Sequence, residues 1–192
     1  MHRLFVALPL PQAIRDLLID AMDDSPELGW IGEDNLHLTL RFIGAVERPL
    51  ANDIAAALGA IHAAAFELAV AGTGSFDRRN GGALWAAVTP RSPVAALAAK
   101  ADRACTATGL APERRAFHPH ITLARYKRTS AAAARDFLER SRGLASAPFA
   151  VDRFTLFESH LSRHGAHYEA VAEFPLAEHP GDPEVARPAP GP

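Results

Sequence analysis

The segments NLHLTLRFIG (residues 35–44) and FHPHITLARY (residues 117–126) share one pattern. Each contains a histidine, an aliphatic residue, a threonine and a leucine in that order, beginning at His37 and at His120. Successive side chains of a β-strand point to opposite faces, so both segments are typical of strands with one buried face. The sequence therefore predicts two strands that each present a histidine and a threonine, Thr39 or Thr122, on the same face.

Helical and strand patterns alternate around the two motifs, and two strands flank the glycine-rich turn RRNGG. Expected strands cover residues 2–8, 28–32, 36–43, 66–72, 83–89, 120–126, 149–159 and 166–175, and expected helices lie within residues 11–24, 50–65, 93–108 and 130–141. Each half of the chain thus combines one motif strand with further strands and two helices. This order predicts an internally duplicated, bilobal α+β fold, with two mainly antiparallel sheets facing a central groove and helices outside.

The composition is that of an ordinary globular protein. Of the 192 residues 48% are apolar and 22% are charged, and the net charge is −2. We expect residues 1–178 to form one bilobal domain and the proline-rich residues 179–192 to be a disordered tail.

The single cysteine, Cys105, excludes an internal disulfide or a cysteine-rich metal site and fits a cytoplasmic location. Pro9 and Pro11 interrupt the first apolar run, which we expect to be a strand and not a signal peptide. No segment approaches the roughly 20 apolar residues of a membrane span, so no membrane partner is expected.

Two histidines that face a ligand from opposite sides suit in-line displacement at phosphorus. One neutral imidazole removes a proton from the nucleophile, and one protonated imidazole gives a proton to the leaving oxygen. Threonine hydroxyls and an arginine would bind the phosphate oxygens. This scheme needs neither a metal nor a cofactor.

Three other interpretations remain open for the same residues. Thr39 and Thr122 are good strand formers and can serve cross-strand packing alone. Both histidines can be satisfied core groups. His37, His118 and His120 can also ligate a metal, although no carboxylate or thiol in either motif completes a familiar ligand set.

The chain resembles the 2H phosphoesterases, and among them the bacterial and archaeal RNA 2',3'-cyclic phosphodiesterases once called 2'-5' RNA ligases. NLHLTLRFIG, FHPHITLAR, the opening RLFVALPLP and the closing YEAVAEFPL carry the resemblance, which spans roughly residues 2–176. It implies metal-independent opening of a terminal cyclic phosphate to a 2'-phosphate. His37 would be the proton donor and His120 the proton acceptor, with Thr39 and Thr122 binding phosphate.

Arg125 and Arg41 are alternative candidates for the arginine that binds phosphate. The resemblance implies Arg125, whereas strict strand alternation places Arg41 on the histidine face. A β-bulge would turn Arg125 toward the groove. For either arginine, a surface salt bridge is the simpler role.

Cations and aromatic side chains near the second motif suggest contacts with RNA. Stacking on a terminal base is a candidate role for Phe117, Phe76 and Tyr126, and packing in the core is the simpler one. Phosphates upstream of an RNA end could bind to a basic patch of Arg114, Arg115, Arg125, Lys127 and Arg128, although a solvated loop explains the patch equally well.

The resulting hypothesis is a cytoplasmic, monomeric RNA 2',3'-cyclic phosphodiesterase that acts on RNA ends. The hypothesis leaves open that the reaction also runs in reverse as 2'-5' RNA ligation. Two alternatives remain. The first is a 2H phosphodiesterase for small cyclic nucleotides or ADP-ribose cyclic phosphate. The second is a non-catalytic module that binds RNA ends.

Overall fold

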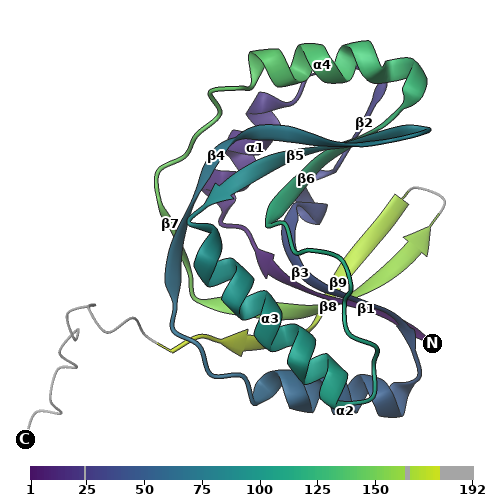
Figure 1. Cartoon of the computed structure of the whole chain (residues 1–192), viewed down its shortest axis with the longest axis vertical. Helices are drawn as coiled ribbons and strands as arrows, with labels where there is room; N and C mark the ends of the chain where they lie inside the picture. Colours follow the sequence, from purple (N-terminus) through teal and green to yellow (C-terminus); the bar gives the residue numbers. More distant parts are fainter. Residues whose placement is uncertain (24, 163–164, 178–192) are drawn as a thin grey trace, which may run out of the picture.

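The computed structural model describes residues 1–23, 25–162 and 165–177 and has the expected α+β architecture (Figure 1). The elements follow in the order β1 (His2–Pro9), α1 (Gln12–Ala21), β2 (Leu28–Trp30), η1 (Glu33–Asn35), β3 (His37–Val46), α2 (Arg48–Gly59), β4 (Phe66–Arg78), β5 (Gly81–Thr89), α3 (Arg91–Ala107), β6 (His120–Lys127), η2 (Arg128–Ser130), α4 (Ala131–Arg140), β7 (Phe149–Val151), β8 (Arg153–Ser162) and β9 (Gly165–Pro175). The predicted tail, residues 179–192, lies outside the described residues.

The strands form one strongly curled antiparallel sheet with a lobe at each end (Figure 1). Its strand order is β7-β4-β5-β6-β3-β1-β8-β9, and β2 also pairs with β6. The motif strands β3 and β6 are neighbours at the centre, where Leu38 pairs with Ile121. The predicted bilobal fold is therefore confirmed, and the two sheets are in addition joined edge to edge along the motif strands.

The lobes do not correspond to the two halves of the chain. Strand β2 comes from the N-terminal half but pairs with β6, and β8 comes from the C-terminal half but pairs with β1. Each lobe thus contains strands from both halves, an exchange that periodicity alone does not reveal because it says nothing about pairing partners.

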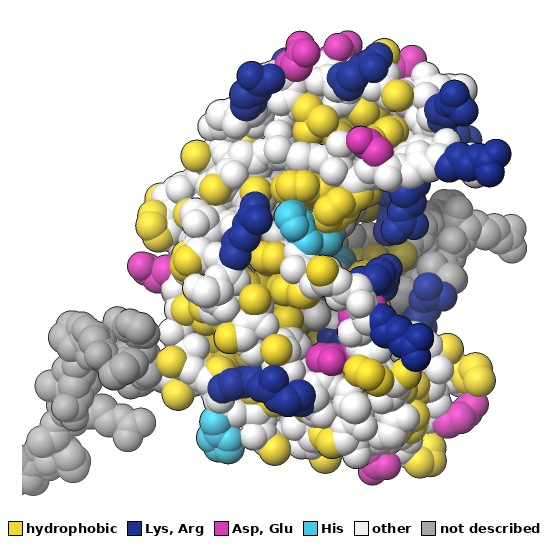
Figure 2. Space-filling model, viewed as in Figure 1, with side chains coloured by type: hydrophobic (Ala, Val, Ile, Leu, Met, Phe, Trp, Pro, Cys, Tyr) yellow, Lys and Arg dark blue, Asp and Glu magenta, His cyan; other side chains and the backbone are white. Residues whose placement is uncertain are grey.

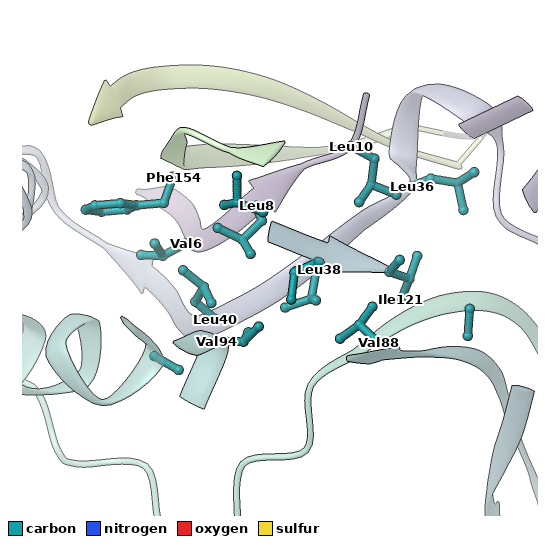
Figure 3. Close-up of a cluster of buried hydrophobic side chains, with 14 of the residues drawn as sticks. Val6, Leu8, Leu10, Leu36, Leu38, Leu40, Val88, Val94, Ile121 and Phe154 are labelled. Carbon is teal, nitrogen blue, oxygen red and sulfur yellow. The ribbon is translucent and has the colours of Figure 1, made fainter. Parts of the chain in front are cut away.

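Helices cover the outer face of the sheet. Helices α2 and α3 pack together, with α3 against β3, while α4 packs over β4, β5 and β6. Between helices and sheet lies a continuous apolar core (Figure 3). Leu38 and Ile121 are completely buried in it, so the apolar faces of both motif strands are fixed in the core and their histidines face the other way.

Three elements differ clearly in extent from the prediction. The strand expected over residues 66–72 continues to Arg78, because β4 stays paired with β5 as far as Gly81. The helix expected over residues 50–65 ends at Gly59, since glycine is a poor helix former and the chain turns there with the Ile61 amide bonded to the Leu58 carbonyl. The strand expected over residues 149–159 is two strands, because β7 pairs with β4 and β8 with β1 and β9. Among the described residues, no helix is long and apolar enough to cross a membrane.

Candidate active site

The two motifs meet where β3 and β6 pair. Leu38 and Ile121 are directly opposite each other. In an antiparallel pair the flanking residues are also opposite, so His37 faces Thr122 and Thr39 faces His120 across the two strands. All four side chains are half-buried on the face away from the core. The sequence prediction that two imidazoles and two hydroxyls converge is thus matched by their placement.

Both histidines are held in the same tautomer by a hydrogen bond to the backbone carbonyl two residues earlier. His37 Nδ1 lies 2.6 Å from the carbonyl oxygen of Asn35, and His120 Nδ1 lies 2.6 Å from the carbonyl oxygen of His118. A carbonyl oxygen only accepts hydrogen bonds, so each Nδ1 carries a proton. Nε2 is therefore the nitrogen that can gain or lose a proton in each ring.

Thr39 contributes a hydrogen bond to the reactive nitrogen of His37. Its Oγ1 lies 3.1 Å from His37 Nε2. While the imidazole is neutral, the hydroxyl donates to Nε2. Once Nε2 is protonated, it becomes a donor and the hydroxyl proton is released for another acceptor.

Aromatic rings surround both imidazoles. The His37 ring lies 4.9 Å from Phe5 and 5.2 Å from Tyr168, centroid to centroid. The His120 ring lies 4.8 Å from the edge-on Phe76. Trp85 lies nearby and makes an edge-on contact with His118. These rings cover part of each imidazole and so reduce its contact with water.

Reduced contact with water controls the protonation of the two imidazoles. Burial lowers the pKa of His37 to about 4, against a smaller raising effect of the Asn35 carbonyl and with a further lowering by His120. Burial also lowers the pKa of His120, opposed by its bond to the His118 carbonyl. Both imidazoles are therefore neutral near pH 7 in the free protein.

Each motif strand contains a β-bulge just after its threonine. The pairing of β3 with β1 skips Leu40, and the pairing of β6 with β5 skips Leu123. The extra residue interrupts the alternation, so that the residue two positions later returns to the histidine face. Phe42 and Arg125, each five residues after its histidine, therefore point to the groove, and both are exposed. A bulge thus gives Arg125 the orientation that its assignment requires.

The same bulge turns Arg41 away from the histidines. Arg41 is only 9% exposed, its Nε lies 2.9 Å from Asp102, and its Nη1 lies 3.5 Å from Glu113. Its Nη2 donates to the carbonyl oxygen of Ala111 at 2.5 Å. Strict alternation was wrong here: Arg41 ties β3 to α3 and to the segment that leads to β6, and it lies outside the groove.

A cavity of about 690 Å³ contains four of the predicted site residues, namely His37, Thr39, Thr122 and Arg125. This volume is in the range of pockets that bury small molecules. Figure 2 shows histidine side chains in the hollow between the lobes, with Lys and Arg side chains gathered along one side. His120 does not line this cavity, but it faces Thr39 at its border.

Several cavity residues were not predicted from the sequence. They include a cation, three aromatic side chains and a glycine: Arg3, Trp30, Phe42, Tyr168 and Gly44. Phe42 had a usable signal, since it occupies the same position in the first motif as Arg125 in the second. Arg3 and Tyr168 lie within the quoted opening and closing segments, but nothing in either segment indicates a shared cavity.

The predicted aromatic and basic contacts are mostly placed elsewhere. Phe117 is 38% exposed and lies outside the cavity. Phe76 packs against His120, and the Tyr126 hydroxyl bonds to Asp77. Of the five basic residues in the predicted patch, Arg125 alone lines the cavity, and Arg115 is paired with Glu113 at 3.1 Å.

The metal interpretation lacks a ligand set. Within residues 1–23, 25–162 and 165–177, no group of three or more His, Cys, Asp or Glu side chains is arranged to hold a metal ion. His118 Nε2 is buried without a hydrogen-bond partner among these residues, and the His118 ring makes edge-on contacts with Phe76 and Trp85. The His118 side chain therefore serves packing beside His120.

A bilobal α+β fold with two His-x-Thr strands paired at its centre defines a protein of the two-histidine phosphoesterase class. The chain belongs to the 2'-5' RNA ligase superfamily, which matches residues 9–163. The family predicted from the two motifs is thereby confirmed.

The relatives of this chain are named as enzymes of one kind. It is 34% identical over 179 residues to an RNA 2',3'-cyclic phosphodiesterase of Geobacillus stearothermophilus, covering 90% of this chain but only 56% of that protein. It is 32% identical over 150 residues to an RNA 2',3'-cyclic phosphodiesterase of Aeropyrum pernix, covering 77% and 85% of the two chains. These names agree with the expected activity.

Solved structures support the same relationship. The crystal structure of Escherichia coli LigT in apo form superimposes with a TM-score of 0.74 at 27% identity, covering 92% of this chain and 98% of LigT. LigT complexed with 3'-AMP gives a TM-score of 0.71 at 28% identity, covering 91% and 98%.

Proposed function

We propose that this protein is an RNA 2',3'-cyclic phosphodiesterase that opens a terminal 2',3'-cyclic phosphate to a 2'-phosphate without a metal ion. The observation that carries the proposal is the pairing of β3 with β6 at Leu38 and Ile121, which sets two histidines and two threonines on one face. The names of the relatives and the 3'-AMP complex of LigT support RNA as the substrate class.

The reaction requires one proton to be removed and one to be supplied. His120 Nε2 accepts a proton from a water molecule, which attacks phosphorus. The bond from phosphorus to the 3' oxygen breaks, and His37 Nε2 donates its proton to that oxygen. The phosphate stays on the 2' oxygen, so atoms and charge balance.

Thr39, Thr122 and Arg125 bind the phosphate in this scheme. The hydroxyls donate to non-bridging oxygens, and the guanidinium offsets the negative charge that grows in the transition state. Thr39 becomes available for this purpose when His37 is protonated, because its hydroxyl then no longer donates to Nε2.

The donor role of His37 requires that the substrate change its protonation. In the free protein burial keeps the pKa of His37 at about 4. A bound phosphate anion favours the imidazolium and raises this pKa. We therefore infer that His37 becomes protonated as the substrate binds.

The catalytic unit in this proposal is the single bilobal domain over residues 1–178, acting as a cytoplasmic monomer. Sedimentation of the purified protein tests the monomer: a concentration-independent mass near 20.5 kDa supports it, and a dimer mass refutes it.

The direct test is incubation of an RNA that ends in a 2',3'-cyclic phosphate, followed by identification of the product. We expect a 2'-phosphate end, and turnover that survives EDTA. A 3'-phosphate product would contradict the proposed leaving group. Loss of turnover on chelation, restored by zinc or manganese, would contradict metal-independent catalysis.

A further inference from the structure

The cavity continues beyond the catalytic residues, and its far part is larger than a single phosphate needs. It extends from His37 and Thr39 over the face of β1 and β3 to Gly44, and to Tyr168 on β9. One cation lies in that direction among the cavity residues, namely Arg3 on β1. This second charged position is not used by the mechanism above.

Arg3 is too far from the reacting phosphate to bind it. Ala7 of β1 pairs with Thr39, and Arg3 lies four residues further along the same strand. At about 3.3 Å per strand residue, the backbone of Arg3 is about 13 Å from that of Ala7. A phosphate held by Thr39, Thr122 and Arg125 is therefore outside its reach, whereas a phosphate further along a bound strand is within it.

The cavity surface between Thr39 and Arg3 has an exposed aromatic ring on which a base can stack. Phe42, 58% exposed, is the most exposed aromatic side chain among the described residues, and it lies 6.3 Å from Phe5, centroid to centroid. An aromatic face of this kind is a platform for a base. Beyond it, Gly44 has a φ of 91° and its missing side chain leaves the floor open.

Arg3 is a cation whose side chain is not engaged by another side chain of the described residues, as a ligand of a phosphate requires. It is exposed, and the described residues provide it with no ion pair or side-chain hydrogen bond. Arg41 and Arg115, by contrast, are paired with carboxylates. A guanidinium at the cavity wall without a protein partner is free to bind an anion.

We propose that the cavity is a binding site for the RNA strand upstream of the cyclic phosphate, with Phe42 as platform for a base and Arg3 as ligand of an upstream phosphate. The inference rests on the proposed function, in which the substrate is an RNA end, and it assigns the residues that bind the strand upstream of the cyclic phosphate. It speaks against small cyclic nucleotides as the preferred substrates.

The test compares two substrates with the same terminal nucleoside, 2',3'-cyclic AMP and the trinucleotide ApApA 2',3'-cyclic phosphate. The measured quantity is the ratio of their kcat/KM values. We expect the native protein to prefer the trinucleotide, Arg3→Ala to lower the ratio about tenfold, and Arg3→Lys to retain most of it. The salt dependence of log KM for the trinucleotide should become shallower by about 0.7 in Arg3→Ala, since one contact to single-stranded RNA is lost.

Arg103→Ala is the matched control. Arg103 is exposed on α3 and lies outside the cavity. Its replacement should leave the ratio unchanged. An unchanged ratio in Arg3→Ala, or an equal fall in Arg103→Ala, would overturn the inference, because the effect would then not depend on the position of Arg3. If the native protein opened neither substrate, the proposed function itself would fail.

Discussion

The pKa of His37 should rise by about three units when a phosphate monoester binds. In the free protein it is about 4, chiefly because the ring is buried. At pH 7 the protonated fraction is then about one in a thousand, too small for an efficient proton donor. A phosphate anion about 4 Å away interacts with the imidazolium by about 4 kcal/mol at an effective dielectric constant of 20. One pKa unit corresponds to 1.36 kcal/mol, so the bound value should be about 7.

The measurement is an NMR titration of the imidazole resonances, free and saturated with 2'-AMP. His37→Gln assigns the His37 signal by removing it. The exposed His62 is the control, because it lies outside the cavity and its resonances should keep their positions when the nucleotide is added. A bound His37 pKa that stays below about 5 would refute its role as proton donor, and His120 would have to supply the proton.

Further changes separate the roles of the site residues. His37→Ala and His120→Ala should each lower turnover by about 10² to 10⁴-fold. The pH profile should lose its alkaline limb in His37→Ala and its acidic limb in His120→Ala. Loss of the same limb in both variants would contradict two-histidine catalysis. Because burial lowers the pKa of His37 from 6.5 to about 4, the folded state binds fewer protons than the unfolded state in that range. Stability should therefore fall by about 3 kcal/mol as the pH drops from 6.5 to 4, and urea unfolding of His37→Gln should lack this part of the loss. Arg125→Ala should lower turnover at unchanged thermal stability. Arg41→Ala should lower the free energy of unfolding by about 1–3 kcal/mol, because it removes the ion pair with Asp102 and the hydrogen bond to the Ala111 carbonyl. Equal thermal stability of the two variants would contradict the different placements of the two arginines.

The central strands could be predicted because their patterns are local. The alternation around His37 and His120 fixes which side chains face the core, and the repeated threonine marks the reactive face. The apolar partners Leu38 and Ile121 are fully buried, as that alternation requires. Alternation could not predict that the two sheets are joined by the pairing of β3 with β6. The two strands are far apart in the sequence, and their pairing does not change the periodic pattern of either one.

The arginines demonstrate a second limit. Strict alternation favoured Arg41, but one extra residue in β3 turns its side chain into the core. A bulge depends on the pairing strand, so periodicity does not reveal it. The same insertion makes Phe42 a cavity residue, and a position-by-position comparison of the two motifs would have found it. Arg3 joins the cavity only through the tertiary arrangement of β1 and β3.

The exchange of strands between the lobes has a consequence for how this chain acquires its structure. The lobe that contains β1 can be completed only after β8 and β9 have been synthesised, because β1 pairs with β8 and β8 with β9, whereas the lobe that contains β6 needs the chain only as far as β7. Contacts between residues so distant in sequence raise the contact order and slow folding. Thermal or urea unfolding should accordingly proceed in one cooperative transition that the two lobes share, and a chain cut at the β4–β5 turn should yield two fragments that fold only when mixed.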